Sequence, residues 1–248
     1  MKISIITVCY NAEKTIEKTI KSVLNQGYKN IEYIIVDGNS TDNTMNIITN
    51  YRNEVDIIIS ENDNGIYDAI NKGINASSGE IIGILNADDI LFNNNIITKI
   101  VEVFIESPEL EAVIGDIIFQ DSSNKIRRYY SSQKWSIHKF SSGYMPPHPS
   151  FYCKKINFHK FGLYNTSFKI AADYELLIIF LKIHNLSYKY VPLIFVKMSL
   201  GGVSTRGISS FLTINSEIFK ACKLNGIKTN YLKLYSKYFI KIFEYFKF

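Results

Sequence analysis

Residues 79–89 read GEIIGILNADD, an apolar run over residues 80–85 that ends in two adjacent carboxylates. A short apolar run between turn residues is typical of a buried strand. Three similar runs precede it, at residues 2–9, 31–36 and 55–60, and segments with helical spacing lie between them, at residues 13–26, 41–51 and 66–75. This alternation predicts an α/β fold, a mostly parallel sheet with helices on both faces.

Polar side chains follow each of these four predicted strands. The clusters are Tyr10-Asn11, Asp37-Gly38-Asn39-Ser40, Glu61-Asn62-Asp63-Asn64-Gly65 and Asn86-Ala87-Asp88-Asp89. Ligands of parallel sheets bind outside the carboxyl ends of the strands, where such clusters meet. We therefore expect a binding site at this edge.

Composition narrows the class of protein. The 248 residues suit one large domain, or a domain with a modest subdomain, and 46% hydrophobic residues suffice for a core. The three cysteines form no CxxC pair, which argues against a disulfide scaffold and a cysteine-based zinc site. The four histidines form no HExxH motif, which argues against a zinc protease. No apolar run spans a bilayer and no secretory signal is evident, so we expect a cytoplasmic protein. GxGxxG and P-loop signatures are also absent.

The positive charge is concentrated at the carboxyl end. Residues 220–248 hold seven lysines and one glutamate, a net charge of +6, which leaves −1 for the rest of the chain. This distribution does not suggest a nucleic-acid binder. Aromatic and aliphatic residues between 231 and 246 recur at helical spacing, which predicts an amphipathic helix. Such a helix would bind an anionic membrane surface, pack on the body of the protein, or form a dimer contact.

Several of these polar residues have side chains suited to nucleotide and metal chemistry. Asp88 and Asp89 could bind a hard divalent cation that holds a diphosphate. Asp37 could accept hydrogen bonds from a base or ribose, and Tyr10 could stack on a base. Asp173, at the start of an apolar helix predicted over 171–183, could act as a general base or simply cap that helix.

The chain resembles a family 2 inverting glycosyltransferase of the GT-A fold, of the kind that builds bacterial surface polysaccharide. Four motifs carry the resemblance in order, IITVCYN at 5–11, IIVDGNSTD at 34–42, NGIYDAINKG at 64–73 and GEIIGILNADD at 79–89. Residues 145–151 and 171–175 extend it to about residue 205. The resemblance implies a nucleotide-sugar half at 1–115, an acceptor half at 116–215 and a membrane-associating helix at 216–248.

The resemblance also implies roles for individual residues. Thr7, Tyr10 and Asp37 would hold uridine, Asp88 would contact the ribose or metal region, Asp89 would bind Mn²⁺ or Mg²⁺, and Asp173 would deprotonate the acceptor. Donor contacts are also expected from Asn39, Asp63 and Lys72, and an acceptor contact from His148. The sequence departs from the family pattern at two positions. Asn86 stands where the DxD motif has its first aspartate, and Ala172 stands where the family has the glutamate of a Glu-Asp pair. The QxxRW pattern of processive synthases is absent.

These features predict transfer of one hexose from a UDP-sugar to a polyprenyl-diphosphate-linked glycan, as in O-antigen or capsule synthesis. The enzyme would lie on the inner face of the cell membrane, and a homodimer is possible. Two alternatives remain open: a sugar-phosphate nucleotidyltransferase, which would release pyrophosphate, and a non-catalytic scaffold that binds nucleotide sugars.

Overall fold

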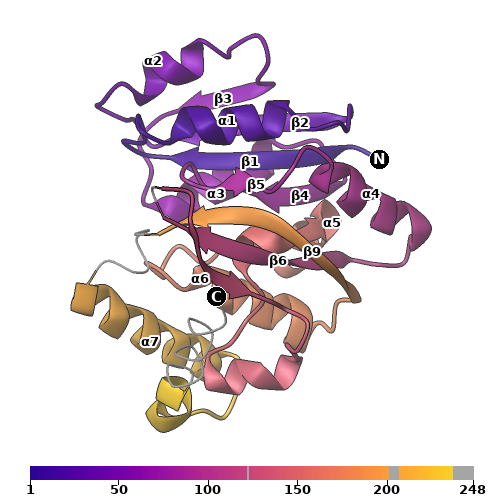
Figure 1. The fold of residues 1–248 in the computed structure, drawn as a ribbon. Helices are drawn as coiled ribbons and strands as arrows, with labels where there is room; N and C mark the ends of the chain where they lie inside the picture. Colours follow the sequence, from indigo (N-terminus) through magenta and orange to yellow (C-terminus); the bar gives the residue numbers. More distant parts are fainter. Residues whose placement is uncertain (122, 201–206, 237–248) are drawn as a thin grey trace.

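The computed structural model describes residues 1–121, 123–200 and 207–236 (Figure 1). Its first part alternates strands and helices as expected. In chain order these are β1 (Ile3–Cys9), α1 (Ile16–Leu24), β2 (Ile31–Asp37), α2 (Thr44–Thr49), β3 (Ile57–Ser60), α3 (Ile66–Ala76) and β4 (Ile81–Ile84). β1 pairs in parallel with β2 and β4, and β2 pairs in parallel with β3. The predicted parallel α/β unit is confirmed.

The sheet is covered on both faces, which explains why its strands read as continuous apolar runs. All residues of β1 are buried, and alternate side chains point to opposite faces. Ile6 and Val8 join a core with residues of α3, whereas Ile3 and Ile5 join a second core with residues of α1 and α4 (Figure 1). The prediction of helices on both faces is therefore confirmed.

The second part of the chain extends the same sheet. Its elements are β5 (Ile90–Leu91), α4 (Ile96–Glu106), β6 (Ala112–Gln120), β7 (Ile126–Tyr130), 3₁₀ turns η1 (Ile137–Ser142) and η2 (His148–Ser150), β8 (Phe151–Lys154), α5 (Lys155–Phe161), α6 (Ala172–Leu177), the π-helical η3 (Ile178–Ile183), β9 (Tyr188–Ser199) and α7 (Gly207–Leu224). The strand order is β3-β2-β1-β4-β8-β6-β9-β5, with β7 paired to β6. β8 runs antiparallel to both β4 and β6, so it joins the two parts.

Several elements of the second part differ from the sequence prediction, and β5, β7, β8 and α5 were not predicted. The helix expected over 171–183 is α-helical only to Leu177 and continues as a π-helix. β9 was not predicted, because Pro192 interrupts its apolar pattern and proline usually marks the edge or end of a strand. The β6–β9 register shifts between Ile114 and Ile117, in the stretch of β9 that contains Pro192.

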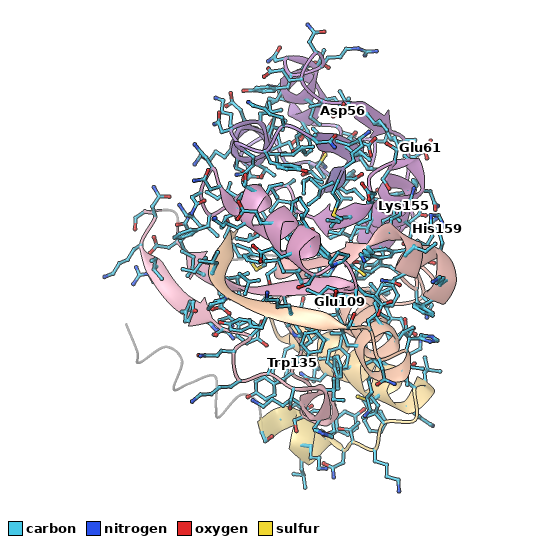
Figure 2. The ribbon with its side chains drawn as sticks, turned by 90° about the vertical axis from the view of Figure 1, so that its right-hand side faces the viewer. Asp56, Glu61, Glu109, Trp135, Lys155 and His159 are labelled. Atoms are coloured by element: carbon cyan, nitrogen blue, oxygen red, sulfur yellow. The ribbon has the colours of Figure 1, made fainter. Side chains whose placement is uncertain are left out.

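Aromatic side chains fill the lower part of the molecule, where the sequence between residues 122 and 143 showed little periodicity. Trp135 lies there, as Figure 2 shows, with its ring edge-on to those of Phe140 and Tyr188 at centroid distances of 5.2 and 5.7 Å. Phe140 in turn meets Tyr174 of α6 at 5.6 Å. Ring packing thus orders a segment that has few regular backbone hydrogen bonds.

The tail helix expected over 216–248 is not confirmed as one continuous element in the part that the structure describes. Its expected start at residue 216 lies inside α7, and the chain turns after Leu224, where Gly226 has a φ of +68°. A short helical turn follows at 231–236; Leu234 is buried there, and Tyr231 stacks on Phe219 of α7 with ring centroids 4.9 Å apart. The apolar positions from 238 onward lie outside the described residues. None of the helices in the described ranges has the length and apolar character needed to cross a bilayer.

Gly83→Ala tests the junction between the two parts. A Cβ on Gly83 would lie 2.2 Å from Cε1 of Tyr152 on β8. Because overpacking costs about 1–3 kcal/mol, we expect the free energy of unfolding to fall by that amount in urea titrations. Gly27→Ala is the matched control, since its Cβ would meet only ordinary contacts at 3.5 Å or more. Equal stability of the two variants would contradict this packing.

Candidate active site

The loops after β1, β2 and β3 meet at one edge of the sheet, as predicted. A Cβ built on Gly38 would lie 2.4 Å from Oδ2 of Asp63 and 3.5 Å from Cδ2 of Tyr10. Any larger residue at position 38 would therefore require the Asp63 carboxylate to move. The Tyr10 side chain is 62% exposed, so its ring is available for stacking on a flat ligand. These three residues form a cradle with one exposed aromatic surface and one hydrogen-bond acceptor.

Asp37 lies behind this cradle rather than in it. Its buried carboxylate accepts hydrogen bonds from the Ser40 N–H at 3.0 Å and the Ser60 hydroxyl at 2.8 Å, and also from the Ser40 hydroxyl. The Cys9 thiol is a further donor, and burial raises the pKa of that thiol far above its usual range. In this structure Asp37 ties the ends of β1, β2 and β3 together, and the predicted direct contact with a base is not evident.

Thr7 requires a correction. Its side chain is fully buried, and its hydroxyl accepts a hydrogen bond of 3.1 Å from Tyr33. Thr7 therefore belongs to the interior between β1 and β2, because a residue two positions before the strand end does not reach the edge loop. The predicted uridine contact by Thr7 is not supported.

Asn39 and Lys72 hold the loop that follows β3. Asn39 donates from Nδ2 to Oδ1 of Asn62 at 3.1 Å. The Lys72 ammonium lies 2.9 Å from the Glu61 carboxylate and donates to the Asn62 carbonyl at 2.8 Å. Lys72 is thus paired within the protein, which differs from the expected contact with a phosphate.

The acidic loop after β4 has one accessible and one buried carboxylate. Asp88 is half-buried, whereas Asp89 is only 1% exposed. Burial, with a contribution from the charge of Asp88, raises the pKa of Asp89 well above its usual range. The Thr19 hydroxyl of α1 donates to the carbonyls of Ala87 and Asp89, at 2.9 and 2.7 Å, and so fixes the loop. Sequence reasoning missed this role of Thr19.

The residues of this loop fit a hard divalent cation. Oδ1 of Asn86 is buried and accepts no hydrogen bond from the described residues. This oxygen and the Asp88 carboxylate are donors that Mg²⁺ and Mn²⁺ prefer. In the described ranges no group of three or more His, Cys, Asp or Glu side chains could hold a metal alone. A cation here would need oxygens from a ligand or water, as is usual for metals bound to a diphosphate.

Asp173 is brought to the same edge by Tyr67, in the first turn of α3. The Tyr67 hydroxyl donates to the carbonyl of Ile170 and lies 3.4 Å from Oδ1 of Asp173. Burial raises the pKa of Asp173 to about 6, although hydrogen bonds from the Tyr174 N–H and from Tyr67 oppose the shift. A carboxylate with a pKa near neutrality is suited to accept a proton at physiological pH.

His148 is buried, so a direct contact with an acceptor is not supported. Its Nε2 lies 2.6 Å from the Tyr164 hydroxyl, and burial lowers the pKa of His148 to about 4, which leaves it neutral. The Tyr164 ring stacks on Tyr67 at 5.8 Å. The Asn71 side chain, one turn after Tyr67, bonds both the N–H and the carbonyl of Tyr164 at 3.0 and 2.8 Å. Tyr67 and Asn71 lie in the motif at 64–73, and their spacing of four is the signal that could have identified them.

The sequence is similar to those of known glycosyltransferases. Residues 4–167 match the family model for glycosyl transferase family 2. The chain is 29% identical over 178 residues to an uncharacterized glycosyltransferase of Mycobacterium tuberculosis (strain ATCC 25618 / H37Rv), covering 71% of this chain and 67% of the relative. It is 32% identical over 143 residues to glycosyltransferase GlyG of Streptococcus pneumoniae, covering 56% of this chain and 47% of the relative. This chain thus spans about half to two thirds of these relatives.

Solved structures show the same fold. The S. aureus TarS 1–349 complex with UDP-GlcNAc superposes with a TM-score of 0.70 at 18% identity, covering 91% of this chain and 65% of that one. The mannosyltransferase PcManGT from Pyrobaculum calidifontis, in complex with GDP-Man and Mn²⁺, superposes with a TM-score of 0.65 at 16% identity, covering 88% of this chain and 64% of that one. The family match covers well over half of the chain, from the first strand of the sheet past the cradle and the acidic loop, and the chain therefore belongs to glycosyl transferase family 2.

Proposed function

We propose that this protein transfers one hexose from a UDP-sugar to a glycan hydroxyl, with inversion at the anomeric carbon. The observation that carries the proposal is the contact of Tyr67 with Ile170 and Asp173. It links a carboxylate of raised pKa to the helix that starts directly after the Asp63 loop. A proton acceptor and a nucleotide cradle on one edge are what a direct displacement at a sugar requires.

The exposed groups of the edge suit a nucleoside diphosphate. The Tyr10 ring would stack on the base, and the Asp63 carboxylate would accept a hydrogen bond from the base or the ribose. Asn39, beside the same loop, would add a polar contact. The solved relatives were captured with UDP-GlcNAc and with GDP-Man, so nucleotide sugars as a class agree with the fold, and uridine is the base that we propose here.

A divalent cation completes the proposed donor site. Asp88 and Oδ1 of Asn86 would hold Mn²⁺ or Mg²⁺ together with the diphosphate, while the buried Asp89 would shape the loop. When bound, the cation would neutralise the charge that develops on the leaving diphosphate. This assignment gives Asp88 the principal ligand role, because Asp89 is almost completely buried.

The proposed chemistry is a single displacement. Asp173 removes the proton from the acceptor hydroxyl as its oxygen bonds to the anomeric carbon. The bond from that carbon to the UDP oxygen breaks on the opposite face, so an α-linked donor yields a β-linked product. Buried Tyr67 and Tyr164 keep Asp173 in place and limit the access of water to its carboxylate.

The proposed acceptor is a polyprenyl-diphosphate-linked glycan of a surface polysaccharide such as O-antigen or capsule, used at the inner face of the membrane. The support is a surface that combines apolar and basic groups. Leu232 is 83% exposed, and Leu212 and Tyr231 are also exposed. Lys228 and Lys233 are exposed as well and lie close to Leu232 in the sequence. Such a surface suits an anionic lipid interface, and each lysine near it contributes about 1 kcal/mol.

Asp88→Asn tests the donor site. UDP release from a panel of UDP-sugars should require Mn²⁺ or Mg²⁺, stop with chelator, and fall by about 10²–10³ in the variant. Isothermal titration should show that UDP binding loses its dependence on metal. Glu102→Gln, on the exposed face of α4, is the control for loss of a carboxylate. Metal-independent release by the wild type would contradict the assignment. Pyrophosphate release from UTP and a sugar 1-phosphate, with no UDP released from any UDP-sugar, would favour a nucleotidyltransferase.

Asp173→Asn tests the base. The rate of transfer should fall by about 10²–10⁴ while UDP binding is retained. For the wild type, kcat should decline below pH about 6, because the carboxylate of raised pKa is protonated there. Tyr67→Phe should move this acidic limb to higher pH, since the phenol donates to the ionised carboxylate. Undiminished activity of Asp173→Asn would contradict the proposed role and, with UDP binding intact, would favour another base.

Leu232→Glu tests the membrane surface. The full chain should sediment with vesicles that contain phosphatidylserine and much less with neutral phosphatidylcholine vesicles, and the variant should bind at least tenfold more weakly. Ile126→Glu, an exposed apolar position on the β7 hairpin, should bind as the wild type does. Equal binding to both kinds of vesicle, or an unaffected Leu232→Glu, would contradict this surface.

A further inference from the structure

A carboxylate from α7 holds the loop that leads to Asp173. Glu217 accepts hydrogen bonds from three consecutive backbone N–H groups, those of Lys169, Ile170 and Ala171, at 2.7, 2.9 and 2.9 Å. One carboxylate oxygen takes the first bond and the other takes the remaining two. Bonds from neutral donors to an ionised acceptor are stronger than those between neutral groups.

This loop is held from two sides. The carbonyl of Ile170 accepts the Tyr67 hydroxyl from α3, while its N–H donates to Glu217 from α7. The next residues, Ala171 and Ala172, lead directly into α6 and Asp173. A shift of the loop would therefore move the Asp173 carboxylate relative to the cradle.

We propose that Glu217 is a positioning residue for the transfer reaction, acting through the 169–171 loop on Asp173. The inference rests on the proposed role of Asp173 as base. Glu217 does not touch the reacting atoms. Its carboxylate supplies the acceptors that the N–H groups of this non-helical loop would otherwise lack. It thereby fixes the backbone from which α6 begins.

The charge of Glu217 has a second effect. The titratable groups that act on Asp173 are the phenols of Tyr67 and Tyr164 and the Glu217 carboxylate. The nearby negative charge of Glu217 adds to burial in raising the pKa of Asp173. Glu217→Gln keeps an oxygen acceptor for the loop but removes this charge, so the two effects can be separated.

Hydrogen exchange tests the loop directly. In the full chain, the amides of residues 169–171 should exchange at least roughly tenfold faster in Glu217→Ala than in the wild type, and less so in Glu217→Gln. Ser216→Ala, an exposed neighbour on α7, should leave exchange unchanged. Thermal unfolding of every variant identifies any global loss of structure. Unchanged exchange in a folded Glu217→Ala would overturn the inference.

Kinetics of UDP release test the effect on the reaction. We expect kcat of Glu217→Ala to fall roughly tenfold with the donor KM within about twofold, since the cradle is untouched. In Glu217→Gln the acidic limb of kcat should move to lower pH. If amide exchange were faster in Glu217→Ala but its kcat were unchanged, and if the acidic limb of the pH profile of kcat did not move in Glu217→Gln, the role of Glu217 would be purely structural. That result would overturn the inference. A wild type that releases no UDP from any donor would instead contradict the proposed function itself.

Discussion

The hydrogen bond from the Tyr67 hydroxyl to the Ile170 carbonyl is the contact on which the rest of the site depends. Tyr67 begins the helix that follows the β3 loop, so it is fixed to the nucleotide edge. Ile170 lies three residues before Asp173. One turn later, Asn71 bonds both polar backbone groups of Tyr164. These contacts join two parts of the chain that the sequence separates by almost a hundred residues.

Most polar residues of the edge support loops rather than face a ligand. Asp37, Thr19 and Glu217 each satisfy backbone groups or hydroxyls of a neighbouring loop. The loops that carry Tyr10 and Asp63 are thereby held by hydrogen bonds from neighbouring elements. Preorganisation of this kind is what allows a few accessible groups to bind and orient a substrate. The packing that holds these loops also buries Asp173, and this burial raises the pKa of its carboxylate.

The sequence predicted the parallel unit well, because strands buried on both faces read as unbroken apolar runs between helices. It predicted that the loops bearing Tyr10, Asp63 and Asp88 meet at one edge, and it left the position of Asp173 relative to that edge open. It could not show that Thr7 and His148 are buried, since exposure depends on packing against residues far along the chain. β9 was hidden by Pro192. Glu217 carries no local signal, because its partners are backbone groups some fifty residues earlier.

We propose that the cradle, the acidic loop and the Asp173 loop form one ligand site. Backbone NMR of the full chain, titrated with UDP and Mg²⁺, is the measurement to make. We expect shifts at Tyr10, Gly38, Asp63 and Asp88, with a smaller response at residues 170–174 transmitted through Tyr67. Shifts confined to other surfaces, or none at saturating UDP, would contradict it.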